Sequence, residues 1–173
     1  MATQHEPRFE FLYEINVELA APIDVGATPH GHRMIVPLAG GSFEGPALKG
    51  KVLPGGGDWL VVRPDGMAEL DVRSTLQTDD GALIYVSYKG LISRIMEILP
   101  RLAAGEAFDR NQYYFMATPS FETSSERYAW LQQTVAVAIG ELTQGGGVTY
   151  RVYAVSSQIG TSPVPTAAMA ATV

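Results

Sequence analysis

The stretch that most constrains the fold runs from Arg33 to Gly90, because short strand-like runs alternate there with tight-turn signals. The runs are rich in β-branched, aromatic and alternating residues, which is typical of strands. They are Arg33–Leu38, Ala47–Leu53, Trp59–Arg63, Met67–Thr78 and Ala82–Lys89. The segments between them supply the positive φ angles and the fixed proline φ that tight reversals need. These segments are Gly40-Gly41, Gly55–Gly57, Pro64–Gly66 and Asp79–Gly81. The stretch therefore predicts a β-meander.

Further patterns flank the meander. In Phe9–Leu19 the odd-numbered residues are apolar and most even-numbered ones are polar, which predicts a strand with one buried face. A polar connection is expected over Asp24–Arg33. The one helix is predicted over Leu91–Leu102, where apolar residues recur at three- and four-residue spacing, although Pro100 should kink or break it. Three more strands are predicted at Gln112–Thr118, Trp130–Ile139 and Val148–Val155, the last after the turn Gly145–Gly147.

About nine strands and one short helix predict an all-β fold. Closure into an antiparallel barrel would remove the exposed edges that so many strands otherwise present. We expect a barrel of lipocalin-like general shape, closed by the Phe9 and Val148 strands, with the helix packed at one end. With 173 residues, of which 46% are hydrophobic, the chain suits one core. Residues 1–155 should form a single domain and residues 156–173, which carry little charge and two prolines, a C-terminal tail.

Composition excludes several classes of function. The net charge is −6 and no basic stripe is present, so nucleic acid is not an expected partner. The chain has no cysteine, which rules out disulfides and thiolate chemistry and suits a reducing compartment. No apolar run approaches the roughly 18 residues that would suggest a membrane span, and the first residues do not have the pattern of a signal peptide. We therefore expect a cytoplasmic protein without a membrane partner.

Several short motifs together carry a family resemblance. They are Arg33 within HRMIVPLAGGSFEGPALKGKVLPGGGDW, the Asp65-Gly66 turn, Asp71-Val72-Arg73, Asp80–Tyr85, Tyr113–Phe115, Phe121-Glu122 and Tyr128–Leu131. From about Phe9 to Val155 the chain resembles the DUF3237 (UPF0311) proteins, small β-barrel proteins without an established general function. Met116 departs from the family pattern, which often has Arg at that place. The resemblance implies a barrel like those of lipocalin-type binding proteins and supplies no catalytic assignments.

One strand offers the most suggestive polar pattern. Glu69, Asp71 and Arg73 share one face of the Met67–Thr75 run, and Ala68, Leu70 and Val72 share the other. The polar face points either to solvent, with a weak Asp71–Arg73 surface pair, or into a barrel lumen that holds a small ligand. Leu70 and Val72 should be buried in either case. The candidate catalytic residues are Glu69, Asp71, Arg73 and Tyr114, and the candidate ligand-binding residues are Arg33, Trp59, Tyr85, Glu122, Tyr128 and Trp130.

In a lumenal site these groups would divide the chemistry between them. Pairing with Arg73 would keep Asp71 ionised, whereas a desolvated Glu69 or Glu122 would have a raised pKa and could serve as a general acid or base. Arg33 and Arg73 suit a carboxylate, enolate or phenolate oxygen. Each aromatic residue also has an ordinary interpretation as part of the core.

Metal and phosphate chemistry have weaker support. His30 and His32 form a His-x-His pair, but it lies in a Pro-Gly loop without a third ligand nearby in the sequence, so we predict no metal and no cofactor. The glycine runs lack the helix and the Gly-Lys-Ser/Thr ending of a phosphate loop.

Two classes of function stay open. The first is a barrel that binds an aromatic, terpenoid or polyketide-like small molecule and catalyses a cofactor-independent acid–base step such as cyclisation, isomerisation or hydrolysis. The second is a structural or interaction protein whose barrel is filled with side chains; a cupin-like metal enzyme is a third and weaker alternative. Because both faces of the Trp130–Ile139 run are partly apolar, we also expect a homodimer with a sheet-face interface.

Overall fold

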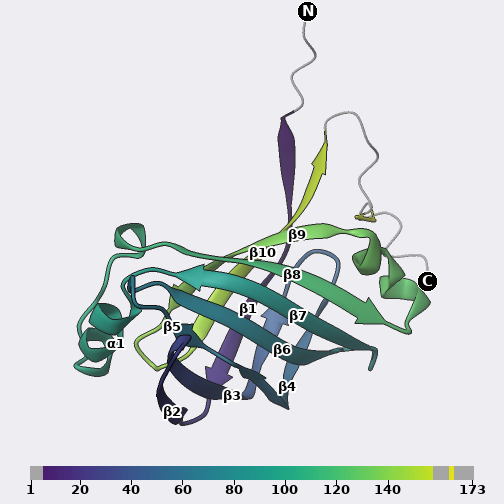
Figure 1. The fold of residues 1–173 in the computed structure, drawn as a ribbon. Coiled ribbons are helices and arrows are strands. Elements are labelled where there is room, and N and C mark those ends of the chain that lie inside the picture. Colours follow the sequence, from purple (N-terminus) through teal and green to yellow (C-terminus); the bar gives the residue numbers. More distant parts are fainter. Residues whose placement is uncertain (1–5, 158–163, 166–173) are drawn as a thin grey trace, which may run out of the picture.

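The computed structural model describes residues 6–157 and 164–165 and shows a ten-stranded antiparallel sheet that closes on itself (Figure 1). The strands are β1 (Pro7–Leu19), β2 (Ile23–Thr28), β3 (Gly31–Glu44), β4 (Lys49–Asp58), β5 (Val61–Val62), β6 (Ala68–Thr78), β7 (Leu83–Ile92), β8 (Phe115–Thr123), β9 (Val135–Leu142) and β10 (Val148–Ser157). Eight of them form a ring in the order β1-β10-β9-β8-β7-β6-β4-β3, and pairing of β1 with β3 closes it. The predicted closed antiparallel barrel is confirmed.

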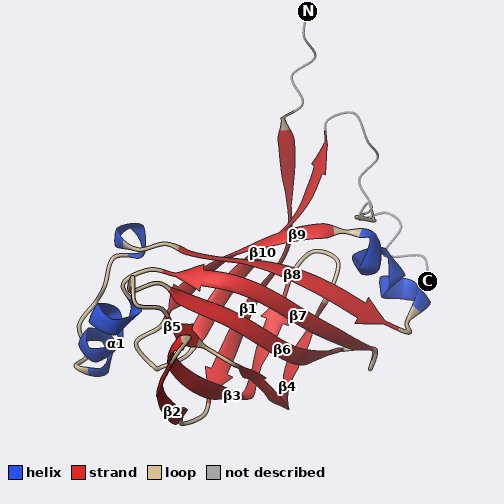
Figure 2. Ribbon diagram, in the orientation of Figure 1, coloured by secondary structure: helices blue, strands red, loops and turns tan. Residues whose placement is uncertain are grey.

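Among the described residues, three short helical segments lie outside the ring: α1 (Ile95–Ala103), η1 (Arg110–Gln112) and η2 (Glu126–Gln133). The first lies at one end of the barrel and η2 lies at the opposite end (Figure 2). Two predicted boundaries were wrong here. Leu91 and Ile92 pair with β8 as the last residues of β7, so the helix begins only at Ile95. Trp130 belongs to η2, and the strand predicted to start there begins at Val135.

The meander also differs from the predicted one in detail. Gly55–Gly57 does not form a turn but lies inside β4, where the register with β6 shifts between Leu53 and Gly57. A Cβ on Gly56 would approach the Arg73 carbonyl oxygen to 2.2 Å, so close contact between strands requires the glycine. Strand β4 consequently runs on to Asp58, and only Val61–Val62 remains of the Trp59–Arg63 strand.

Two other predicted segments are corrected. The Asp24–Arg33 connection contains β2 and the start of β3, which pair through the two-residue turn at Pro29-His30. The strand predicted over Gln112–Thr118 starts later, at Phe115, and extends to Thr123. In both places tertiary pairing, which the local sequence does not encode, fixes the strand ends.

An irregularity in β1 changes which side chains enter the core. The register with β10 shifts between Phe11 and Tyr13, and Leu12 and Tyr13 are both buried. Phe9 therefore pairs with Val155 and lies on the outer face, where 60% of it is exposed. The alternation predicted for Phe9–Leu19 holds only from Tyr13 onwards.

Side chains fill the half of the barrel away from α1. Tyr13 packs edge to face against Phe43 and Phe121, with ring centroids 5.6 and 6.5 Å away. Leu76, Ile84 and Leu131 are completely buried. This half matches the filled barrel that the sequence left open as an alternative, and the space that is left lies toward α1. No helix within residues 6–157 is long and apolar enough to cross a membrane.

Candidate functional site

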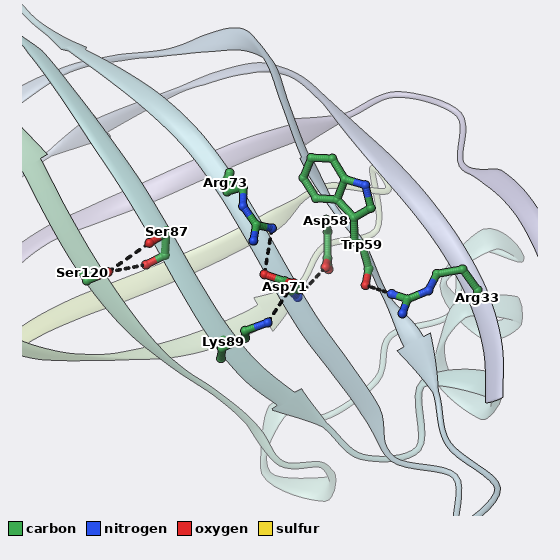
Figure 3. A network of polar contacts seen from close by, with 8 residues as sticks. All are labelled: Arg33, Asp58, Trp59, Asp71, Arg73, Ser87, Lys89 and Ser120. Carbon is green, nitrogen blue, oxygen red and sulfur yellow. Dashed lines mark hydrogen bonds and ion pairs between the residues drawn. The ribbon is translucent and has the colours of Figure 1, made fainter. Parts of the chain in front are cut away.

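The polar face of β6 lies on the outside of the barrel. Leu70 and Val72 are buried as predicted, at 4% and 2% exposure. Because side chains alternate along a strand, Glu69, Asp71 and Arg73 point away from the lumen. Of the two orientations that the sequence left open, the structure shows the one that faces solvent; Figure 3 shows Asp71 and Arg73 on this face.

A network of ion pairs saturates this outer face. The Lys89 ammonium lies 2.7 Å from Asp71 Oδ2, and the Arg73 guanidinium donates to Asp71 Oδ1 at 2.8 Å (Figure 3). The hydrogen bond from Lys89, aided by the Arg73 charge, lowers the pKa of Asp71. The Arg33 guanidinium donates to the Trp59 carbonyl oxygen. Asp71 is thus held ionised and paired, which makes it a poor proton acceptor at neutral pH.

Half of the predicted site residues do come together, in a groove on this outer surface. The groove has a volume of about 410 Å³. Its lining includes Arg33, Trp59, Glu69, Asp71 and Tyr114. Arg73 lies beside the groove, paired with Asp71, and the other four lie elsewhere. Tyr85 and Glu122 are cross-strand neighbours on the outer face, Trp130 is half-buried in η2, and the buried Tyr128 donates its hydroxyl to Asp80 at 3.2 Å.

A second cavity lies inside the barrel, at the end that α1 covers. It has a volume of about 220 Å³ and is mostly apolar, with side chains from strands all round the ring and Ile95 and Leu99 from α1. The strand registers place one row of its lining residues side by side. Val36 pairs with Asp58, Asp58 with Val72, and Val72 with Tyr88, so these four side chains share the inner face.

Asp58 is the only carboxyl group among the described residues that line this cavity. One of its oxygens, Oδ1, accepts the backbone N–H of Asp71 at 2.9 Å. Burial raises the pKa of Asp58 to about 6, and the negative charge of Asp71 adds to the rise, whereas the Asp71 N–H, Arg33 and Lys89 oppose it. Asp58 can therefore take up or release a proton near neutral pH, unlike Asp71 on the other side of the same wall.

Two tyrosines bring hydroxyl groups into the same space. The Tyr88 hydroxyl donates to the Tyr150 hydroxyl at 3.2 Å, and the two rings pack edge to face with centroids 5.5 Å apart. Within residues 6–157 no group accepts the remaining Tyr150 proton, so a ligand in the cavity can accept it. Burial, and to a lesser degree the charge of Asp58, raises the pKa of both hydroxyls, which keeps them protonated as donors.

The sequence did not predict a role for Asp58, Tyr88 or Tyr150, although the pattern around the two tyrosines carries a usable signal. Side chains alternate between the two faces of β7. Tyr88 shares its face with the apolar Ile84 and Val86, which identifies it as the inward-facing tyrosine, whereas Tyr85 lies on the other face. Tyr150 likewise falls between Val148 and Val152 on the buried face of β10. Asp58 gave no such signal, because the preceding glycines indicated a turn.

The residues that the structure describes do not support a metal site at the His30 and His32 pair. His32 Nε2 lies 2.8 Å from Asp24 Oδ1, across the β2–β3 hairpin. Over the part of the chain that the structure describes, no three His, Cys, Asp or Glu side chains are close enough together to hold a metal ion.

The lumen thus places the Asp58 carboxyl group, which titrates near neutral pH, and the protonated Tyr150 phenol in one mostly apolar enclosure. A low-dielectric enclosure strengthens each polar interaction within it. Such a pair can remove a proton from one substrate atom and donate a hydrogen bond or proton to another.

The chain is similar to a known protein family, to curated relatives and to solved structures. A match to DUF3237, a family of proteins of unknown function, covers residues 7–155. A UPF0311 protein of Clostridium acetobutylicum is 38% identical over 133 residues, which are 76% of this chain and 84% of that protein. The crystal structure of a β-barrel-like protein from Acinetobacter baumannii AYE matches with a TM-score of 0.77 and 41% identity, over 90% of this chain and 100% of that one.

A more distant relative carries a functional name. The hydroalkoxylation enzyme phnH of Penicillium herquei is 28% identical over 131 residues, which are 75% of this chain and 72% of that protein. The family match and the bacterial relatives confirm the resemblance seen in the sequence: the chain belongs to the DUF3237 family.

Proposed function

We propose that this protein is a cofactor-independent acid–base enzyme that binds a small, ring-containing, hydroxylated molecule in the barrel lumen. The observation that carries the proposal is the juxtaposition of Asp58, Tyr88 and Tyr150 in a mostly apolar cavity. A cavity of about 220 Å³ suits a compact ring or the ring portion of a larger molecule. A mostly apolar lining with few polar groups would fix the orientation of such a ligand.

The reaction that these groups support best is the addition of a hydroxyl group across a carbon–carbon double bond. Asp58, when ionised, takes the proton of the substrate hydroxyl, and the oxygen forms a bond to one alkene carbon while the π bond breaks. The other alkene carbon gains a proton, for which protonated Asp58 is the source, and Tyr150 donates a hydrogen bond to negative charge on a conjugated oxygen. Atoms and electrons balance without an oxidant. The hydroalkoxylation enzyme of Penicillium herquei, a relative of this chain, supports this class of reaction.

The outer groove is the second candidate, because it is larger and collects several residues that the sequence singled out. Its carboxylate Asp71 is already paired with Lys89 and Arg73, so it favours binding over proton transfer. The lumen therefore has the stronger claim to catalysis.

A cyclisation assay tests the proposal. The substrate is 2-hydroxyphenyl vinyl ketone, which closes a ring by adding its phenol O–H across its double bond. We expect the protein to accelerate closure over buffer, with a rate that rises through about pH 6 as Asp58 ionises. Asp58→Asn should reduce the rate on the order of a hundredfold and Tyr150→Phe about tenfold.

Three controls make the outcome specific. Asp79→Asn removes an exposed carboxylate of the same type, which lies 3.6 Å from Lys49, and should leave the rate within about twofold of wild type. Tyr153→Phe removes a hydroxyl on the outer face of β10. Loss of activity in Asp71→Asn but not in Asp58→Asn would move the site to the outer groove, and no acceleration by the wild-type protein would refute the catalytic claim.

A further inference from the structure

Three aromatic rings form one wall of the lumenal cavity, each packed edge to face on the next. The Phe115 ring meets Tyr150 at a centroid distance of 5.1 Å and an angle of 74°, and Tyr150 meets Tyr88 at 5.5 Å and 71°. All three line the cavity. The position of the Phe115 ring therefore affects both the size of the cavity and the position of the Tyr150 hydroxyl.

Gly140 in β9 lies directly behind this ring. It pairs with Tyr150 across the strands and occupies an inward-facing, buried position. A Cβ at this position would lie 2.6 Å from two Phe115 ring atoms and 2.7 Å from a third, whereas ordinary contacts are 3.4–4 Å. Gly140 is not among the glycines with positive φ, so the backbone conformation does not require glycine. What the missing side chain provides is room for the Phe115 ring.

We propose that Gly140 is a specificity-determining position. Because it has no side chain, the Phe115 ring packs directly on the β9 backbone, and this position of the ring sets the depth of the cavity for the ring portion of a ligand. The inference rests on the proposed function, whose ligand it restricts by size. A methyl group at position 140 would displace the ring by about 1 Å to restore ordinary contact, and the cavity is the space on its other side. This displacement should therefore weaken the binding of a two-ring ligand more than that of a one-ring ligand.

Calorimetric titration with phenol and 2-naphthol compares the two ligand sizes. The proteins are wild type, Gly140→Ala, Phe115→Leu and the double variant. We expect Gly140→Ala to weaken 2-naphthol binding at least tenfold and phenol binding less than threefold, and the smaller Leu side chain in the double variant to restore 2-naphthol binding. Gly145→Ala is the matched control, since a Cβ there meets nothing within 4 Å.

Xenon NMR measures the cavity without reference to ligand chemistry, because xenon occupies apolar cavities. We expect the cavity-bound xenon signal to fall in Gly140→Ala and to return in the double variant. Unchanged xenon and 2-naphthol binding in a folded Gly140→Ala protein would overturn the inference, as would a double variant that restores neither. If xenon follows the expected order but the wild type binds neither phenol nor 2-naphthol, the depth assignment stands and the proposed ligand chemistry fails.

A variant that does not fold leaves the inference testable. Phe115→Leu alone should enlarge the cavity, so it should bind more xenon and bind 2-naphthol more tightly than wild type. If Phe115→Leu changes neither, the ring does not limit the cavity and the assignment to Gly140 is wrong.

Discussion

At the scale of single residues, two aspartates on opposite sides of one barrel wall show how surroundings assign chemical roles. Asp71 accepts hydrogen bonds from Lys89 and Arg73 and has a lowered pKa. Asp58 accepts the backbone N–H of the same Asp71 but faces an apolar cavity, and burial raises its pKa to about 6. An aspartate is therefore a fixed negative charge on the outer face of the wall, and another aspartate is a proton carrier on the inner face.

The raised pKa of Asp58 predicts a pH-dependent cost in stability. The folded pKa of about 6 lies above the ordinary 3.8, so the native state binds more protons between these values, and stability falls as pH rises through this window. Asp58→Asn removes the charge and keeps an oxygen to accept the Asp71 N–H. At pH 7.5 the variant should be more stable than wild type by roughly 1–3 kcal/mol, and at pH 4 the two should be nearly equal.

Urea unfolding at pH 4, 5, 6 and 7.5 measures this difference. Asp79→Asn serves as the control and should show no such pH trend, because its carboxylate is exposed. A stability difference between wild type and Asp58→Asn that is constant across the series would mean that Asp58 titrates normally in the folded protein.

At the scale of elements, β6 separates the two surfaces that compete for a functional role. Val72 fills the inner face and is almost completely buried, whereas the Asp71 ion pairs lie on the outer face. Val72→Ala should destabilise the protein by about 1–3 kcal/mol, because it removes buried methyl groups beside the cavity. Asp71→Asn should cost less than about 1 kcal/mol, because partly exposed ion pairs contribute little.

Chemical denaturation of both variants at pH 7 checks this order. Thr75→Ala, also on the outer face of β6, is the control for loss of side-chain atoms without loss of the lumenal packing. If Asp71→Asn costs more than Val72→Ala, the outer network contributes to stability in a way that isolated surface pairs do not.

The same strands show how far sequence patterns reach. Alternation is local, so regular strands such as β6 and β10 could be predicted, and for β6 the burial of Leu70 and Val72 as well. The bulge at Phe11 and Tyr13 could not, because it is fixed by pairing with β10 and it turns Phe9 to the outside.

The site was harder to predict than the fold, for a physical reason. Asp58, Tyr88 and Tyr150 come from three strands far apart in the sequence, and only the closure of the ring brings them to one cavity. The Glu69, Asp71 and Arg73 pattern was visible because it lies within one strand. A pattern within one strand identifies a face, but the identity of the inner face depends on which partners the strand finds.

At the scale of the whole molecule, β1 and β10 extend beyond the ring (Figure 1). The outer face of this extension and of the adjoining part of β9 bears an apolar patch. Cross-strand pairing lines up its members in two rows. The first row is Phe9, Val155 and Val135, and the second is Phe11, Tyr153 and Val137. Phe9 and Val135 are 60% and 71% exposed within the described chain. Contiguous exposed apolar side chains of this kind mark interaction surfaces.

This patch gives the homodimer expected from the sequence a specific location. We expect two copies to pack this sheet face against each other about a twofold axis, since twofold dimers are the commonest symmetric assemblies and a sheet face can be self-complementary.

Light scattering of the wild-type protein at micromolar concentration should give twice the chain mass of 18.6 kDa. Val135→Glu places a charge in the patch and should shift the mass to that of one chain, whereas Thr118→Glu, on the outer face of β8, should leave the dimer intact. Residues 163–173 lie almost wholly outside the described residues, so truncation after Ser157 tests separately whether the tail contributes to the dimer. A wild-type mass near 18.6 kDa would refute the dimer, and a dimer that persists in Val135→Glu would place the interface elsewhere.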